Sequence, residues 1–243
     1  MRNIAFIISY DGTNYHGFQR QDNVITVQQE IEDALFKITG EKICIHGCGR
    51  TDAKVHALNY LLTFKTESTI PVERFPVAIN SVLNDDVFVK TAWIADDDFH
   101  GRFSVIRKTY VYRINNGEFD PFLKNYVWHY KYPLDVEKMK KAAEFLIGTH
   151  DFNCFMASGG QVESTVRTMF DARVSKNGDT IEISLTADGF LYNMVRIITG
   201  TLVYVGGGKI LPEEVKEIIN SKERTRAGIT APPQGLFMKN VEF

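Results

Sequence analysis

Gly49-Arg50-Thr51-Asp52-Ala53-Lys54-Val55-His56-Ala57 is a short segment, polar at its start, between two apolar stretches. Residues 43–46 and 58–65 have the pattern of strands, so the polar residues are expected on the loop that joins them. Loops held by a rigid scaffold often carry binding and catalytic residues. From the residues alone, Asp52 could belong to a turn, act in an ion pair or act as a nucleophile.

The composition is that of a globular protein. The chain has 243 residues, of which 44% are hydrophobic and 24% are charged, and this length suits one large domain or two modest ones. No apolar run approaches about 18 residues, and the N-terminus lacks the apolar region of a cleavable signal. An odd number of cysteines, three, argues against a secreted disulfide scaffold. We expect a cytoplasmic protein.

The net charge gives only weak information about binding to nucleic acid. The formal net charge is −2, which counts against a protein held to nucleic acid by bulk positive charge. A local basic cleft remains compatible with this value, because the distribution of charge decides such binding.

Strand and helix patterns alternate along the chain. Strands are expected at residues 3–11, 43–46, 58–65, 87–95, 108–115, 167–176, 180–186 and 235–241, and helices at 26–40, 75–83, 135–147, 190–205 and from 212 onward. Asn177-Gly178 predicts a hairpin. Because several strands are adjacent in sequence, the pattern predicts an α+β fold with a mainly antiparallel sheet. We place a domain boundary between residues 104 and 105.

A metal site is a weak possibility. Cys44, His46 and Cys48 alternate and would share one face of a strand. Zinc sites usually combine two closely spaced pairs of ligands, and only His56 and Cys154 remain to complete one here. Packing of small side chains is the better interpretation, and we expect neither a metal nor a cofactor.

Arg196 lies inside the most apolar predicted helix. A buried arginine without a counter-ion is strongly unfavourable, so Arg196 predicts a carboxylate partner. Asp11, Asp52, Asp171 and Asp188 are candidates, and sequence spacing does not choose among them. A purely structural ion pair is an equally good interpretation from physics alone.

Basic and aromatic residues are interleaved in three segments, namely Arg102-Phe103, Arg107 to Arg113, and Lys124 to Lys131. Cations suit phosphates, and flat rings suit the bases of single-stranded or flipped-out nucleotides. Any one segment could be an ordinary strand, but three in succession favour contact with RNA.

The sequence around Asp52 resembles the tRNA pseudouridine synthase A (TruA) family, and ordered matches extend over nearly the whole chain. They are Tyr10-Asp11-Gly12-Thr13, Gly17-Phe18-Gln19, Thr26-Val27-Gln28, the Asp52 segment, Phe99 to Ser104, Arg107 to Arg113, Gly148-Thr149-His150-Asp151-Phe152, Gly189 to Arg196, and Ala231 to Leu236.

The resemblance implies a pseudouridine synthase fold. Its two α/β subdomains, here residues 1–104 and 105–243, would share a mainly antiparallel central sheet with helices on its outer side and an active-site cleft between the halves. Family members are homodimers that use no cofactor. They isomerise uridine to pseudouridine at positions 38, 39 and 40 of the tRNA anticodon stem-loop, detaching the base at N1 and rejoining it through C5.

The resemblance also implies roles for single residues. Asp52 corresponds to the catalytic aspartate acting on a flipped-out uridine, and Arg196 to the buried arginine that pairs with it. Tyr110 corresponds to the tyrosine that stacks on the target base and can take the C5 proton. Leu236 corresponds to an apolar residue of the pocket, and Arg50 to the residue that helps displace the base. Basic residues of the interleaved segments, Arg102, Arg107 and Lys108, are expected RNA contacts.

Four positions depart from the family pattern. Lys54 stands in place of a usual glycine, and a positive φ there would cost about 1 kcal/mol. Phe18 replaces a usual tryptophan, Gly101 a usual alanine and Asn193 a usual histidine.

Two other functions are compatible with the sequence. One is an RNA-binding or RNA-chaperone protein that keeps the fold without turnover, with Lys54 as the mark of lost catalysis. The other is a carboxylate-based glycoside or nucleoside hydrolase. Such a hydrolase normally uses paired carboxylates, whereas only Asp52 stands out here.

Overall fold

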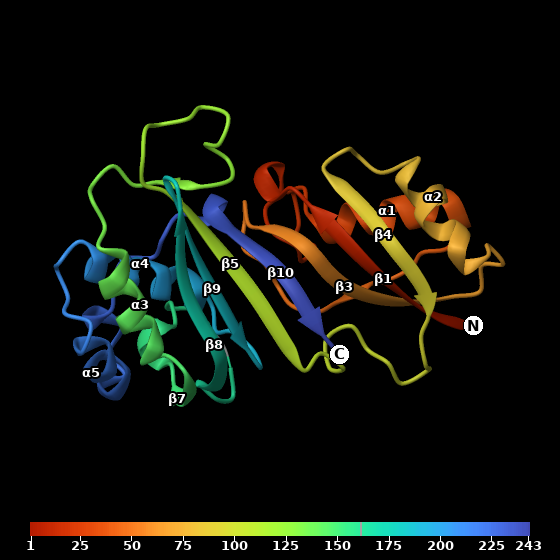
Figure 1. Ribbon diagram of the computed structural model, residues 1–243. Coiled ribbons are helices and arrows are strands. Elements are labelled where there is room, and N and C mark those ends of the chain that lie inside the picture. Colours follow the sequence, from red (N-terminus) through yellow and green to blue (C-terminus); the bar gives the residue numbers. More distant parts are fainter. Residues whose placement is uncertain (161) are drawn as a thin grey trace. The chain divides into compact units, whose positions relative to one another are not determined.

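The computed structural model describes residues 1–160 and 162–243 (Figure 1). The chain packs into two compact units. The first unit consists of Met1–Ile106 together with Phe237–Phe243, and the second consists of Arg107–Leu236.

The first unit is built on a mainly antiparallel sheet. Its strands are β1 (Arg2–Tyr10), β2 (His46–Gly47), β3 (His56–Thr66), β4 (Val87–Ile94) and β10 (Leu236–Glu242). They lie in the order β4-β1-β3-β10, and β2 pairs with β3. β1 is antiparallel to β3 and β4, whereas β10 runs parallel to β3.

Helices α1 (Val27–Thr39) and α2 (Phe75–Asn80) pack against each other, and α2 packs against β4. Phe6 of β1, Phe64 of β3 and Phe75 of α2 are fully buried and form one aromatic cluster. The ring of Phe6 is 4.9 Å from Phe64 and 5.8 Å from Phe75, measured between centroids. The core of this unit therefore lies between α2 and the face of the sheet that carries Phe6.

The predicted ends of α1 are confirmed. The Thr26 hydroxyl accepts a hydrogen bond from the Gln29 amide, and Gly40 ends the helix in a left-handed conformation with φ of 74°. Val27, Ile31 and Leu35 are fully buried, as their spacing on one helical face predicts. Local capping chemistry is thus enough to position this helix.

The strands of the second unit are mainly antiparallel. β5 (Arg107–Asn115), β9 (Thr180–Ala187), β8 (Val166–Asn177) and β7 (Gly148–Asp151) are neighbours in this order, and the short β6 (Trp128–His129) runs parallel to β5. Helices α3 (Val136–Glu144) and α4 (Met194–Gly206) contact β8 and β5 respectively, and α5 (Glu214–Ser221) contacts β7. The Asn177-Gly178 hairpin is confirmed by the pairing of β8 with β9.

Short 3₁₀ helices connect these elements. They span Gly12–Asn14, Val72–Arg74, Asn153–Phe155, Arg224–Arg226 and Pro233–Gly235. Within the described residues, no helix is long and apolar enough to cross a membrane.

Several predicted boundaries were wrong. Helix α2 ends at Asn80 rather than at residue 83, and α3 ends at Glu144 rather than at residue 147. Helix α4 begins at Met194 rather than at residue 190, because Asn193 has a left-handed backbone (φ 60°). The strand predicted at residues 43–46 is limited to His46–Gly47, which pairs with β3. The closing strand β10 pairs with β3 of the first unit. The antiparallel α+β class is confirmed.

Candidate active site

The Asp52 loop, residues 48–55, joins β2 to β3 in the first unit. Thr51 is buried and its hydroxyl is 2.8 Å from the Tyr10 hydroxyl, so this side chain anchors the loop to β1. The neighbouring Asp52 is half-buried, while Arg50 and Lys54 are exposed. The loop therefore combines a fixed hydroxyl with an accessible carboxylate and two cations.

An aromatic floor, formed by Tyr10, Phe18 and Tyr60, supports this loop. The rings of Phe18 and Tyr60 stack at 4.3 Å with an interplanar angle of 25°, and Tyr10 lies 5.7 Å from Tyr60. The Tyr60 hydroxyl donates a hydrogen bond to the carbonyl of Gly49 at the start of the loop. Burial raises the pKa of Tyr10 far above its usual value, so its hydroxyl stays protonated and available for hydrogen bonding to Thr51.

Residues 12–18 hold the same loop through backbone contacts. The Phe18 amide donates to the Thr51 carbonyl and the Lys54 amide donates to the Tyr15 carbonyl, both at 3.2 Å. Gly12 packs so tightly that a Cβ atom there would lie 2.0 Å from the Val55 carbonyl oxygen. The position of Asp52 in the first unit is therefore set by the main chain on both sides of it.

Lys54 has a positive φ of 65°. This is the left-handed conformation for which the sequence predicted a cost, and for a lysine that cost is about 1 kcal/mol. The loop is held in this conformation by the hydrogen bond from the Lys54 amide described above. Strain at a loop beside a candidate catalytic residue is a common feature of functional sites.

His56, directly after the loop, contacts the Asp11-Gly12 segment. The Gly12 amide donates to His56 Nδ1 at 3.0 Å, and Asp11 Oδ1 lies 3.1 Å from the same nitrogen. One nitrogen cannot accept the amide proton and also donate to the carboxylate. We favour the amide contact, because Asp11 Oδ1 already accepts hydrogen bonds from the amide and the hydroxyl of Thr13. The His56 ring stacks on Phe237 at 4.6 Å.

Sequence reasoning missed the supporting residues Tyr10, Tyr60 and His56. Tyr10 and His56 lie inside motifs that were recognised, but their roles depend on which strands pair. Tyr60 alternates with Leu62 and Phe64 along β3, and this periodicity marks it as a core residue without indicating its contact to Gly49.

Arg196 lies in the first turn of α4 in the second unit. Its Nε donates to the Ala231 carbonyl at 2.7 Å and its Nη1 donates to Asn193 Oδ1 at 2.6 Å. The Ala231 amide in turn donates to the Arg196 carbonyl at 3.1 Å. Arg196 is half-buried rather than fully buried.

Tyr110 and Tyr112 of β5 are buried on the same face of the second unit's sheet. The Tyr110 ring meets Phe190 edge-on at 5.1 Å. The Tyr112 hydroxyl donates to the Pro232 carbonyl at 2.6 Å. Burial raises the pKa of Tyr112, and the positive charge of Arg196 opposes this shift, so Tyr112 and Arg196 are electrostatic neighbours.

The remaining predicted residues differ in exposure. Leu236 is buried, and its amide donates to the Pro233 carbonyl. Arg102 and Arg107 are exposed and each lies near an aromatic ring: the guanidinium carbon is 5.5 Å from the Phe103 centroid and 4.4 Å from the Phe170 centroid, respectively. Lys108 is half-buried.

Two other candidate partners of Arg196, Asp171 and Asp188, have contacts within the second unit. Asp171 pairs with Arg173 at 3.0 Å, and Asp188 accepts a hydrogen bond from the Thr168 amide at 3.1 Å. Cys48 is buried with its sulfur 3.5 Å from that of Met238, whereas Cys44 is exposed. In the described part of the chain, no three His, Cys, Asp or Glu side chains could together hold a metal ion.

Comparison with known proteins identifies the family. The tRNA pseudouridine synthase family model matches residues 6–104 and 142–243. The chain belongs to this family. It is 54% identical to the tRNA pseudouridine synthase A of Thermoanaerobacter sp. (strain X514) and 50% identical to that of Caldicellulosiruptor saccharolyticus, over the full length of all three chains. The resemblance carried by the motifs is thereby confirmed.

Similarity to solved structures is much lower. A Cbf5-Nop10-Gar1 complex matches with a TM-score of 0.38 and 10% sequence identity, covering 97% of this chain and 58% of the other.

Asp52, Arg196 and Leu236 lie within the two segments that the family model matches, while Arg107, Lys108 and Tyr110 lie between them.

Proposed function

We propose that the protein is a tRNA pseudouridine synthase that isomerises uridines of the anticodon stem-loop, at positions 38, 39 and 40. Membership of the family supports this activity. The proposal for the site rests on the Asp52 loop, whose main chain is fixed by residues 12–18 and whose Asp52 is half-buried. A reaction without a cofactor requires such a positioned side chain.

Asp52 is the proposed catalytic residue. A flipped-out uridine brings its glycosidic bond to the carboxylate, which attacks the sugar, attacks the base or removes a ribose proton. All three routes require an ionised carboxylate held at a fixed position. The hydrogen bonds around Thr51 and Lys54 supply that position.

Arg196 is the proposed counter-ion of Asp52. Its hydrogen bonds to the Ala231 carbonyl and the Asn193 amide oxygen orient the guanidinium. A guanidinium beside Asp52 would favour the ionised form of that carboxylate.

The other roles follow the family pattern. Tyr110 stacks on the target base and takes the C5 proton, Leu236 lines the base pocket, and Arg50 helps displace the base from its stack. The exposed cations Arg102 and Arg107, together with Lys108, contact the RNA backbone. We further propose that the protein acts in the cytoplasm as a homodimer, with no metal or cofactor.

The test is the variant Asp52→Asn with tRNA that carries tritium at C5 of uridine. We expect wild-type protein to release tritium and to form pseudouridine at the positions named. The variant should bind tRNA but release no tritium, because an amide does not supply the anionic oxygen. Asp22→Asn, at an exposed turn outside the site, is the matched control and should be fully active.

Two results would contradict the proposal. Tritium release by Asp52→Asn at the wild-type rate would remove Asp52 from the catalytic role. Binding of tRNA by the wild-type protein without any pseudouridine would instead indicate an RNA-binding protein that lacks turnover.

A further inference from the structure

Three rings of the first unit form a ladder: His46 of β2, and His100 and Phe103 of the loop that follows β4. The rings of His46 and His100 stack at 4.7 Å with an interplanar angle of 30°, and His100 lies 4.7 Å from Phe103 at 35°. The Arg102 guanidinium extends the series over the Phe103 ring. Phe103 is 76% exposed, so the outer end of the ladder contributes little to the core.

The backbone around the ladder holds it in place. The Gly101 amide donates to the buried Thr63 hydroxyl at 2.9 Å, and a Cβ atom at position 101 would lie 2.1 Å from the His46 carbonyl oxygen. The loop therefore approaches β2 as closely as a glycine permits. This close approach is what brings the His100 ring onto His46.

His100 is held as a neutral ring. The Arg102 amide donates to His100 Nδ1 at 3.0 Å, which assigns the ring proton to Nε2. Burial, with contributions from nearby His46 and Arg102, lowers the pKa of His100. At neutral pH this middle ring of the ladder is therefore uncharged and carries a hydrogen-bond donor at Nε2.

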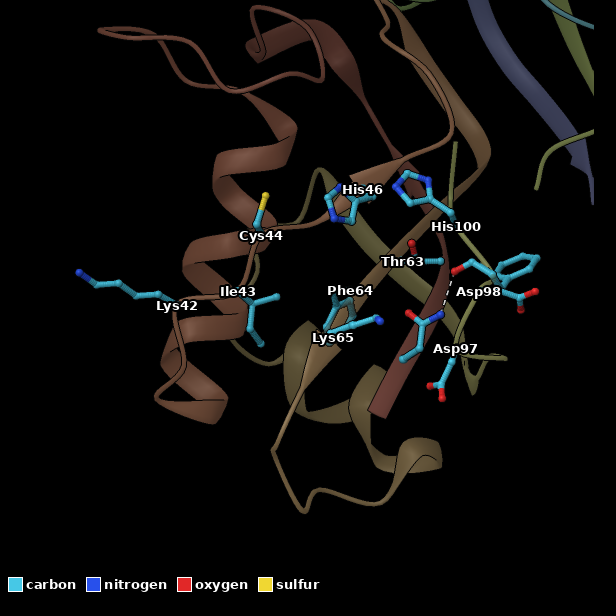
Figure 2. Close-up of a pocket in the computed structure, with 12 residues that line it drawn as sticks. Lys42, Ile43, Cys44, His46, Thr63, Phe64, Lys65, Asp97, Asp98 and His100 are labelled. Carbon is cyan, nitrogen blue, oxygen red and sulfur yellow. Dashed lines mark hydrogen bonds between the residues drawn. The ribbon is translucent and has the colours of Figure 1, made fainter. Parts of the chain in front are cut away.

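The two histidines line a pocket of about 340 Å³ (Figure 2). This volume lies within the range of small-ligand sites. Lys42, Lys65, Asp97 and Asp98 are the charged residues of the lining, and in Figure 2 the Lys42 side chain extends away from the two histidines. The side chain of Asn3, nearly fully buried, also lines it and donates both of its N–H groups to the carbonyls of Asp96 and Phe99, which leaves its oxygen as an acceptor.

We propose that the ring ladder and this pocket bind one unpaired nucleotide of the tRNA, with its base stacked on the exposed His46 end of the ladder and its phosphate at Lys65. Flat rings beside cations are the features that recognise unstacked RNA bases. Carboxylates accept hydrogen bonds only, so Asp97 and Asp98 favour a base with an exocyclic amino group over uracil. This inference rests on the proposed action on tRNA.

The position of the ladder agrees with this role. His46 precedes Asp52 by six residues, which span at most about 20 Å of extended chain. Stacked nucleotides rise by about 3.4 Å each, so the maximum separation of His46 and Asp52 equals the length of about six nucleotides. The bound nucleotide is therefore a near neighbour of the target uridine, and the subsite would help to set which uridine reaches Asp52.

The first experiment compares the steady-state kinetics of His46→Ala and Phe103→Ala with those of Phe88→Ala. All three side chains are exposed in the first unit, and Phe88 of β4 lies outside the ladder. We expect KM for tRNA to rise about 5- to 100-fold in the two ladder variants, as for loss of one stacked base, while kcat stays within about twofold of wild type. Phe88→Ala should match wild type.

The second experiment replaces the unpaired nucleotides of the anticodon stem-loop one at a time by 2-aminopurine, whose fluorescence is quenched by stacking. We expect one position near the target to be quenched by wild-type protein and by Phe88→Ala, but not by the ladder variants. Equal KM values and equal quenching in all four proteins would overturn the subsite. If wild-type protein forms no pseudouridine at all, the proposed function fails instead, so the two failures are distinguishable.

Discussion

Lys54 shows how a single backbone angle affects the loop that carries Asp52. Its φ of 65° is unfavourable for any residue with a Cβ atom. We expect Lys54→Gly to raise the free energy of unfolding by about 0.5 kcal/mol, because relief of about 1 kcal/mol of strain exceeds the extra chain entropy that glycine brings to the unfolded state. Urea unfolding measures this change.

The neighbouring residue provides the control. Ala53 is also exposed, and its φ is not positive, so Ala53→Gly gains no relief and should lower stability by about 0.5–1 kcal/mol. Equal losses in both variants would show that the loop of the protein in solution does not hold residue 54 in the left-handed conformation.

At the scale of residues, the sequence identified the loop but not what fixes it. The alternation of apolar and polar residues placed Asp52 between two strands, and the structure has it there. The sequence overestimated the burial of Arg196, because a helix of mostly apolar residues was expected to be buried on all its faces. Its contacts to Asn193 and Ala231 depend on a left-handed residue and on a distant segment, and hydrophobic periodicity reports neither.

At the scale of elements, Asp151 connects β7 to other parts of the second unit. Its carboxylate accepts hydrogen bonds from the Thr165 hydroxyl and the Asn153 amide and pairs with Lys222 at 2.9 Å. The hydrogen bond from Thr165, followed by that from Lys222, lowers the pKa of Asp151. The Gly148-Thr149-His150-Asp151-Phe152 motif thus carries a structural contact.

This lowered pKa predicts a pH-dependent stability. The stabilisation is present above the unfolded-state pKa of about 3.9 and is lost as the pH falls through the lower folded-state value. We expect Asp151→Asn to be less stable than wild type at pH 7, with the difference shrinking toward pH 3. Urea unfolding at both pH values measures it. A constant difference would show that charge on Asp151 is not involved, and Asp22→Asn serves as the exposed control.

Elements were predictable where their signals are local. Capping residues defined α1, and Asn177-Gly178 defined the hairpin of β8 and β9. The place of β10 was not predictable in this way, because its parallel pairing with β3 joins residues about 180 positions apart. The length of β2 was not predictable either, because it depends on which residues pair with β3.

At the scale of the whole molecule, the net charge of −2 requires local concentration of positive charge for binding to tRNA. Two copies that bind one tRNA would double the number of basic contacts. We expect light scattering after gel filtration to give twice the chain mass of 27.6 kDa. A fully active species of 27.6 kDa would refute the homodimer.

The backbone clamp between residues 12–18 and the Asp52 loop has a consequence for how this sequence can vary. Hydrogen bonds between main-chain groups do not depend on side-chain identity, so Tyr15 and Phe18 can be exchanged for other residues that fill the same space. Gly12 and Gly17 have no such latitude, because a Cβ atom at either would overlap the carbonyl of Val55 or Thr51. We therefore expect the side chains around the Asp52 loop to tolerate substitution, and Gly12 and Gly17 not to tolerate it.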